Sequence, residues 1–75
     1  MLTGRQIREA RPLLSLSPSG LAVKVRVVTT DTVKRAEADA MPPIADSHRK
    51  AIQRKLEELG IEFTPNGPRL RKVEP

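Results

Sequence analysis

The chain has 75 residues, with no cysteine, one histidine and Phe63 as its single aromatic side chain. This length fits one small domain, which buries only ~60% of the surface that its unfolded chain exposes. The lack of cysteine excludes disulfides, thiolate zinc sites and thiol catalysis, and one aromatic residue provides no platform for stacking single-stranded bases. Fourteen Lys and Arg against nine Asp and Glu give a net charge of +5, which indicates a polyanionic partner.

The charge is unevenly distributed along the chain. Residues 1–35 carry seven basic and two acidic side chains. Residues 36–48 carry three acidic side chains and no basic ones, and residues 49–75 carry seven basic and four acidic side chains. This distribution is typical of a domain with one anion-binding side, although ordinary scatter over a solvated surface would also produce it. No apolar run approaches the ~18 residues of a membrane span, and the N-terminus does not resemble a secretory signal. We therefore expect a cytoplasmic protein without membrane contact.

The predicted elements begin with a helix at the N-terminus. Thr3 and Gln6 have the spacing of a capping box, in which each side chain satisfies a backbone N–H at the helix start. Apolar residues then recur at steps of three and four, at Ile7, Ala10 and Leu14. The sequence therefore predicts a helix that begins after Thr3 and buries this stripe.

The second segment is ambiguous between helix and strand. Ser17 followed by Pro18 is a typical helix start, and Leu21 and Val25 have helical spacing. Within residues 21–29, however, valines alternate with basic residues at period two, which favours a strand. Circular dichroism would separate the two alternatives, because a strand here together with a hairpin would hold the helix content well below half.

A third helix is indicated after this segment. Thr29 or Thr30 can cap it, and Asp31 then lies in its first turn, where the helix dipole favours an acidic side chain. Val33 and Ala36 supply its buried side.

A fourth helix and a short tail complete the pattern. Asp46 or Ser47 can cap this helix, and Gly60 is a typical stop signal after it. The tail alternates over residues 61–64 and, after a proline-containing turn, ends in a basic strand candidate at residues 69–73. Because a lone hairpin is marginal in water, we expect it to pack on a helix or to pair with a second subunit.

Several stretches of the chain carry a family resemblance. Residues 3–11 (TGRQIREAR), residues 17–22 and residues 32–38 (TVKRAEA) are similar to the first helix, the start of the second and the body of the third helix of small bacterial regulators of the Xre, lambda-repressor-like family. Residues 51–63 and 69–72 resemble the tail of one short subgroup of that family.

The resemblance implies an all-α fold. We expect a four-helix, lambda-repressor-like helix-turn-helix domain at residues 1–60, followed by a short C-terminal β-strand or hairpin arm at residues 61–75 that is a candidate dimer contact. The second helix would cross the DNA backbone while the third lies in the major groove. Arg11 and Glu37 match a family pair that joins the first and third helices, the alternative being two separate surface charges.

The resemblance places DNA contacts at two helix starts. The start of the second helix would touch phosphate, because free N–H groups and the positive end of the dipole favour anions. The start of the third helix would read base edges. The implied contacts are Ser17, Ser19 and Arg35 with phosphate, and Thr29, Thr30, Asp31 and Lys34 at the third helix, where Asp31 either accepts a hydrogen bond from a cytosine amino group or only caps the helix.

The chain also departs from the family pattern. Pro18 stands where the family usually has a glutamine that contacts the backbone and a base. The turn at residues 25–29 lacks the usual glycine and is one residue longer, and Pro12 replaces a good helix former in the first helix. These departures leave open whether the DNA-binding geometry is kept.

The expected function is that of a sequence-specific, double-stranded DNA-binding transcriptional regulator that acts as a homodimer. We expect no enzymatic activity, since no nucleophile triad, phosphate-binding glycine loop or catalytic carboxylate pair occurs. No cofactor, metal or small-molecule ligand is expected either. The alternative is a protein-interaction module, antitoxin-like or adaptor, built on a degenerate helix-turn-helix scaffold.

Overall fold

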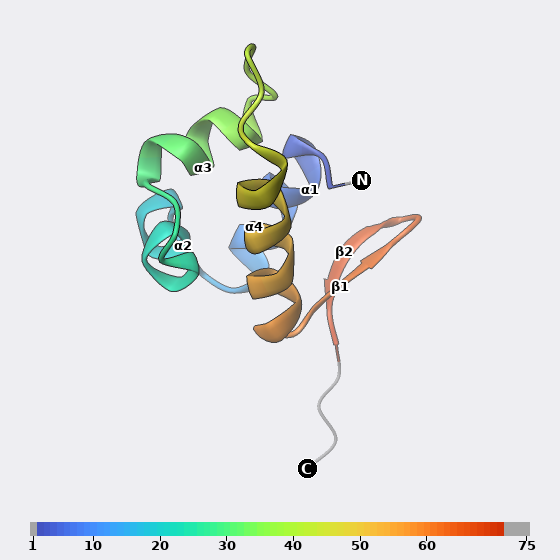
Figure 1. Cartoon of the computed structure of the whole chain (residues 1–75). Coiled ribbons are helices and arrows are strands. Elements are labelled where there is room, and N and C mark those ends of the chain that lie inside the picture. The colour runs from blue at the N-terminus through green and yellow to red at the C-terminus, as the bar shows by residue number, and fades with distance from the viewer. Residues whose placement is uncertain (1, 72–75) are drawn as a thin grey trace.

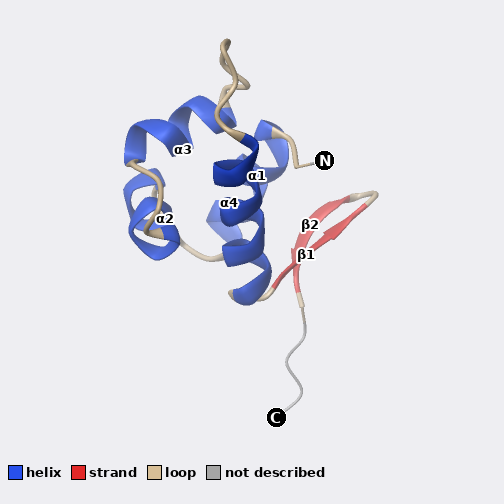
Figure 2. Cartoon of the chain, in the orientation of Figure 1, coloured by secondary structure: helices blue, strands red, loops and turns tan. Residues whose placement is uncertain are grey.

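A computed structural model of the chain describes residues 2–71 and contains, within them, four helices followed by an antiparallel hairpin (Figure 1). The hairpin stands to one side of the helices, beside α1 and α4 (Figure 2). The elements are α1 (Gly4–Leu13), α2 (Pro18–Val25), α3 (Thr30–Glu37), α4 (Asp46–Glu58), β1 (Ile61–Thr64) and β2 (Gly67–Leu70).

The packing of the hairpin corrects the expected fold class. Four helices and a C-terminal hairpin are present as predicted, but the all-α, lambda-repressor-like class is wrong, because β1 and β2 pack against the helices as part of the domain and are not a separate arm. β2 packs along α1, and Ile61 of β1 is buried in the core. The pairing aligns Ile61 with Leu70 and Thr64 with Gly67. Helices with an antiparallel sheet at one side form an α+β arrangement.

The second strand begins earlier than the sequence indicates. β2 starts at Gly67, so the turn contains only Pro65 and Asn66. Gly67 has a φ of 117°, in the region that glycine adopts without strain, and this lets the chain enter the strand directly. The end of the predicted strand, residues 72–73, lies outside the described residues.

The core is aliphatic and receives side chains from all four helices and from β1. Because the chain has a single aromatic residue, branched aliphatic side chains supply most of the buried volume. The largest fully buried side chains are Ile7, Leu21, Val33, Ile52, Leu56 and Ile61.

Side chains cap three of the four helix starts. Thr3 caps α1 within the predicted capping box, and Ser17 caps α2 ahead of a proline at the first helical position. Thr29 caps α3, which settles the choice left open between two threonines. α4 differs from expectation: its cap residue is Ala45, which has no side-chain oxygen, and Asp46 is already helical. The carboxylate of Asp46 lies instead in the first turn of α4, where the positive end of the helix dipole favours a negative charge.

α2 resolves the ambiguity of the valine-rich segment in favour of a helix. Leu21, Ala22 and Val25 are buried, whereas Val23 and Val27 are 75% and 62% exposed. A strand would place all three valines on one face, because side chains alternate at period two. Burial follows the helical stripe instead, so the strand alternative is wrong and two valines remain at the surface.

Candidate nucleic-acid interface

The two helices predicted to contact DNA, α2 and α3, pack against each other and are joined by residues 26–29 (Figure 1). The hydroxyl of Thr30, the first residue of α3, donates to the hydroxyl of Ser19 in the first turn of α2, at 3.3 Å. The starts of the two helices therefore lie next to each other. This places the predicted phosphate-contacting and base-reading segments on one continuous part of the surface.

α3 has one buried and one exposed side. Val33, Ala36 and Glu37 are buried, while Asp31 and Lys34, one turn apart, are exposed. The apolar side fixes the helix on the core, and the polar side remains available to a partner.

Ser17 and Thr29 use their side-chain oxygens to cap their own helices. Ser17 Oγ accepts from the N–H of Gly20 at 3.0 Å, and Thr29 Oγ1 accepts from the N–H of Thr32 at 3.2 Å. Both residues are exposed. A hydroxyl that accepts one hydrogen bond still carries a proton to donate, so the Ser17 cap can also donate to an anion. Thr29 Oγ1 lies in addition 3.0 Å from Thr32 Oγ1, and either hydroxyl can donate to the other, so Thr29 has a proton for an anion when Thr32 is the donor.

Ser19 offers the clearest donor pair at the start of α2. Pro18 has no N–H, and the N–H groups of Gly20 and Leu21 are bonded to Ser17. The backbone N–H of Ser19 has no hydrogen-bond partner within residues 2–71 and lies beside its own exposed hydroxyl. The proline thus removes one donor of this helix start and leaves the adjacent one free.

The two cations of α3 are in different situations. Lys34 is exposed and forms no hydrogen bond or ion pair within the described part of the chain. Arg35 is half-buried, and its Nη2 donates to the carbonyl oxygen of Pro42 at 2.6 Å, which ties α3 to the loop that follows it. Lys34 can therefore meet a ligand with its whole ammonium group, whereas Arg35 is held toward the loop and has only its remaining N–H groups to offer.

The Arg11–Glu37 pair anchors α3 to α1, as the resemblance implies. Arg11 donates from Nε and Nη2 to the two carboxylate oxygens of Glu37, at 2.5 and 2.8 Å, and from Nη1 to the carbonyl of Leu16 at 3.2 Å. The side chain of Glu37 is only 9% exposed. The alternative of two separate surface charges is wrong. A buried bidentate pair fixes the relative position of two helices, whatever its net contribution to stability.

Gly4 allows the start of α1 to touch the end of α3, a contact that sequence reasoning missed. A Cβ at this position would lie within 3.0 Å of the carbonyl oxygens of Ala36 and Glu37, so only glycine fits. The N–H of Gly4 also donates to Asp39 Oδ1 at 3.1 Å. The sequence did contain one indication of this contact: a glycine follows the Thr3 cap at a helical position, where glycine is otherwise unfavourable.

The turn between α2 and α3 contains an arginine in a backbone conformation that favours glycine. Arg26 closes α2 with φ 74° and ψ −41°, and its N–H still donates to the carbonyl of Ala22 at 2.9 Å. This pair of angles lies near the strained γ-turn, and such sparsely populated backbone costs a residue with a Cβ on the order of 1–3 kcal/mol. The missing glycine noted in the sequence therefore corresponds to local strain in the turn.

Comparisons with known proteins return no relative: no family model, no curated protein and no solved structure matches the chain. Within residues 2–71, no three His, Cys, Asp or Glu side chains are grouped so that they could hold a metal ion. In the same part of the chain, no helix has both the length and the apolar character needed to cross a membrane.

Proposed function

We propose that this protein is a sequence-specific transcriptional regulator that binds double-stranded DNA with α3 in the major groove. The observation that carries the proposal is the contact between Ser19 and Thr30, which joins the starts of α2 and α3 into one exposed surface. In this arrangement α2 meets the phosphate backbone while the exposed side of α3 meets base edges.

Charge supports the same assignment. The chain carries +5, and residues 1–35, which contain α2 and most of α3, hold an excess of basic side chains. Ser19 supplies an N–H and a hydroxyl to one phosphate, and Ser17 supplies a hydroxyl proton. Thr29 supplies a hydroxyl proton while Thr32 donates to its oxygen. Lys34 and Thr30 contact base edges, and Asp31 meets a cytosine amino group or only stabilises the first turn.

We further propose a cytoplasmic homodimer. A single module of this size covers too little DNA for tight specific binding, and two-fold symmetry matches a palindromic site. The hairpin is the candidate dimer contact, since Leu70 of β2 is 47% exposed on a two-stranded sheet whose outer edges are unpaired within the described residues.

Two observations favour the second candidate function, a protein-interaction module. Pro18 removes a donor at the start of α2, and Arg35 is bonded to Pro42, so the proposed DNA surface has fewer free donors than its seven polar residues would suggest. A scaffold that has lost DNA binding would retain the helix packing and use another surface.

Selection of bound duplexes from a random pool, followed by titration of the selected duplex, tests the proposal. Lys34→Ala should weaken binding to this duplex by about 10- to 100-fold and relax its sequence preference, as loss of a base contact does. Lys50→Ala, which removes the same charge from α4, is the matched control and should change affinity only slightly. Equal losses in both variants would refute base reading by α3.

Salt dependence separates the two candidate functions. The logarithm of the association constant should fall linearly with the logarithm of the salt concentration, with a slope of about −0.9 for each phosphate contacted. If no duplex from the pool binds even at low salt, the DNA-binding function is excluded and the interaction module takes its place.

A further inference from the structure

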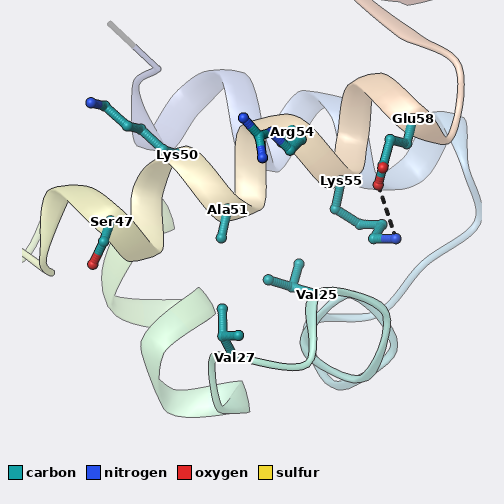
Figure 3. Close-up of a pocket in the computed structure, with 8 residues that line it drawn as sticks. All are labelled: Val25, Val27, Ser47, Lys50, Ala51, Arg54, Lys55 and Glu58. Atoms are coloured by element: carbon teal, nitrogen blue, oxygen red, sulfur yellow. Dashed lines mark ion pairs between the residues drawn. The ribbon is translucent and has the colours of Figure 1, made fainter.

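A groove of about 400 Å³ separates α4 from the end of α2 and the turn that follows it (Figure 3). Its floor is apolar: Val25 and Val27 approach it from one side and Ala51 of α4 from the other (Figure 3). Val27 is 62% exposed, although burial would favour so apolar a side chain. We call this feature the valine groove.

The rim of the valine groove is cationic. Lys50, Arg54 and Lys55 of α4 line it, and the one acidic residue of the lining, Glu58, is 3.0 Å from the ammonium group of Lys55. Lys50 and Arg54 form no ion pair within residues 2–71. Two positive charges beside an apolar floor are therefore without a partner.

A second hollow extends this surface around the end of α2. It is lined by Val23, Lys24 and Arg26, and it shares Val25 and Lys55 with the valine groove. Val23 is 75% exposed. On this combined surface exposed valines alternate with cations, because it is formed largely by the valine-rich residues 23–27.

The apolar floor and the cationic rim together indicate which kind of ligand the valine groove binds. Phosphates of a nucleic acid would pair with the cations but would gain nothing from the exposed valines, because their burial requires apolar groups. An amphipathic helix with aliphatic residues on one side and carboxylates along its flanks would satisfy both features.

We propose that the valine groove binds an acidic amphipathic helix of a partner protein. The aliphatic side of that helix covers Val25, Val27 and Ala51, and its carboxylates pair with Lys50 and Arg54. None of the residues that line the groove belongs to α3 or to the seven predicted DNA contacts, so the site is separate from the proposed DNA surface.

Peptide titration of the full chain, labelled with ¹⁵N, tests this proposal. The probe is a synthetic helical peptide of about 16 residues, near 24 Å long, with leucines on one side and glutamates on the other. Two control peptides replace the leucines by serine or the glutamates by lysine. The leucine-glutamate peptide should shift the amide signals of Val25, Val27, Ala51 and Arg54, with a dissociation constant on the order of 10–100 µM, as for small transient interfaces.

Two variants of exposed residues test the two halves of the surface. Val27→Ser and Arg54→Glu should each weaken peptide binding by at least ~10-fold, the effect of losing an interface anchor. Arg8→Glu, with the same charge change on α1, should leave peptide binding unaltered. Thermal unfolding monitored by circular dichroism verifies that each variant is folded.

Three outcomes would overturn the proposal. Equal binding of the serine peptide would reduce the groove to a general cationic surface. Absence of shifts in the groove with the leucine-glutamate peptide would exclude an acidic helical partner. Shifts of the same groove amides by duplex DNA, lost in Arg54→Glu, would assign the surface to nucleic acid instead.

Discussion

The two ends of α3 are held in contrasting ways. At its C-terminal end, a glycine without room for a Cβ, a bidentate buried ion pair and a side chain-to-backbone hydrogen bond join it to α1, through Gly4, Arg11 and Asp39. At its N-terminal end, α3 follows a turn with a strained Arg26 and an exposed Val27. The C-terminal end of α3 is thus held by an ion pair and by close backbone packing against α1. Its N-terminal end is held by exposed hydroxyl hydrogen bonds of Thr29 and Thr30 and borders an exposed valine.

This contrast indicates that one end of α3 serves folding and that the other end is available to a partner. Contacts at the α1–α3 junction determine where α3 lies, and because they are internal to the domain, folding alone accounts for them. Exposed valines and a strained backbone near the α2–α3 turn do not help the chain fold, and such features are typical of sites that contact a partner. Substitutions at the junction should therefore affect stability strongly, whereas those in the turn should affect it weakly or improve it.

The largest effect is expected at the buried ion pair. Glu37→Ala leaves the guanidinium of Arg11 without its partner and should destabilise the fold by about 3–5 kcal/mol, since it strands a buried charge. Urea unfolding measures the change. The double variant Arg11→Met with Glu37→Leu should recover most of that loss, because it removes both charges. A double variant as unstable as the single one would contradict this account, because the loss would then not come from the unpaired charge of Arg11.

Gly4→Ala should have the next largest effect. The added Cβ collides with backbone carbonyl oxygens, which cannot move aside as a side chain can, so we expect a loss of about 3 kcal/mol, at the upper end of overpacking costs. The control is Gly20→Ala in α2, whose Cβ would meet only side-chain atoms of Leu16 and Ser17, at 3.3 Å. Similar melting temperatures for the two variants would contradict the close approach of α1 and α3.

A smaller loss is expected from the cap of α3. Thr29→Ala removes the oxygen that accepts from the N–H of Thr32 and should cost about 1 kcal/mol. Thr29→Ser keeps that oxygen and should be nearly neutral. Urea unfolding of both variants decides whether the cap is made, and equal losses would place the effect on the methyl group instead.

Arg26→Gly should be stabilising, by somewhat less than 1 kcal/mol. Glycine adopts the positive φ without strain, and its greater freedom in the unfolded chain offsets part of the gain. Thermal unfolding of the wild type and of this variant is the measurement. A melting temperature below that of the wild type would show that the turn is not strained.

Local signals in the sequence predicted most of the elements. The cap residues Thr3 and Ser17 and the stop at Gly60 act within one turn of a helix, so their effect can be read without tertiary structure. The pairing of Arg11 with Glu37, 26 positions apart, came from the family resemblance.

Features that depend on packing could not be predicted in this way. Steric exclusion of a Cβ at Gly4 requires knowing where α3 ends. The valine alternation of residues 23–27 favours a strand locally, and only burial of Leu21 and Val25 against the core decides for a helix. The adjacent starts of α2 and α3, which hold five of the seven predicted contact residues, likewise became visible only in the fold, whereas Lys34 and Arg35 lie in the last turn of α3.

A map of the amide signals that move when the selected duplex is added to the ¹⁵N-labelled protein tests the central claim most directly. If α3 reads DNA, the shifts should fall on residues 17–20 at the start of α2 and residues 29–35 of α3 and its cap, and should be absent from the valine groove. Shifts confined to α4, or no shifts at a duplex concentration that saturates binding in the titration, would contradict the proposed DNA-binding function.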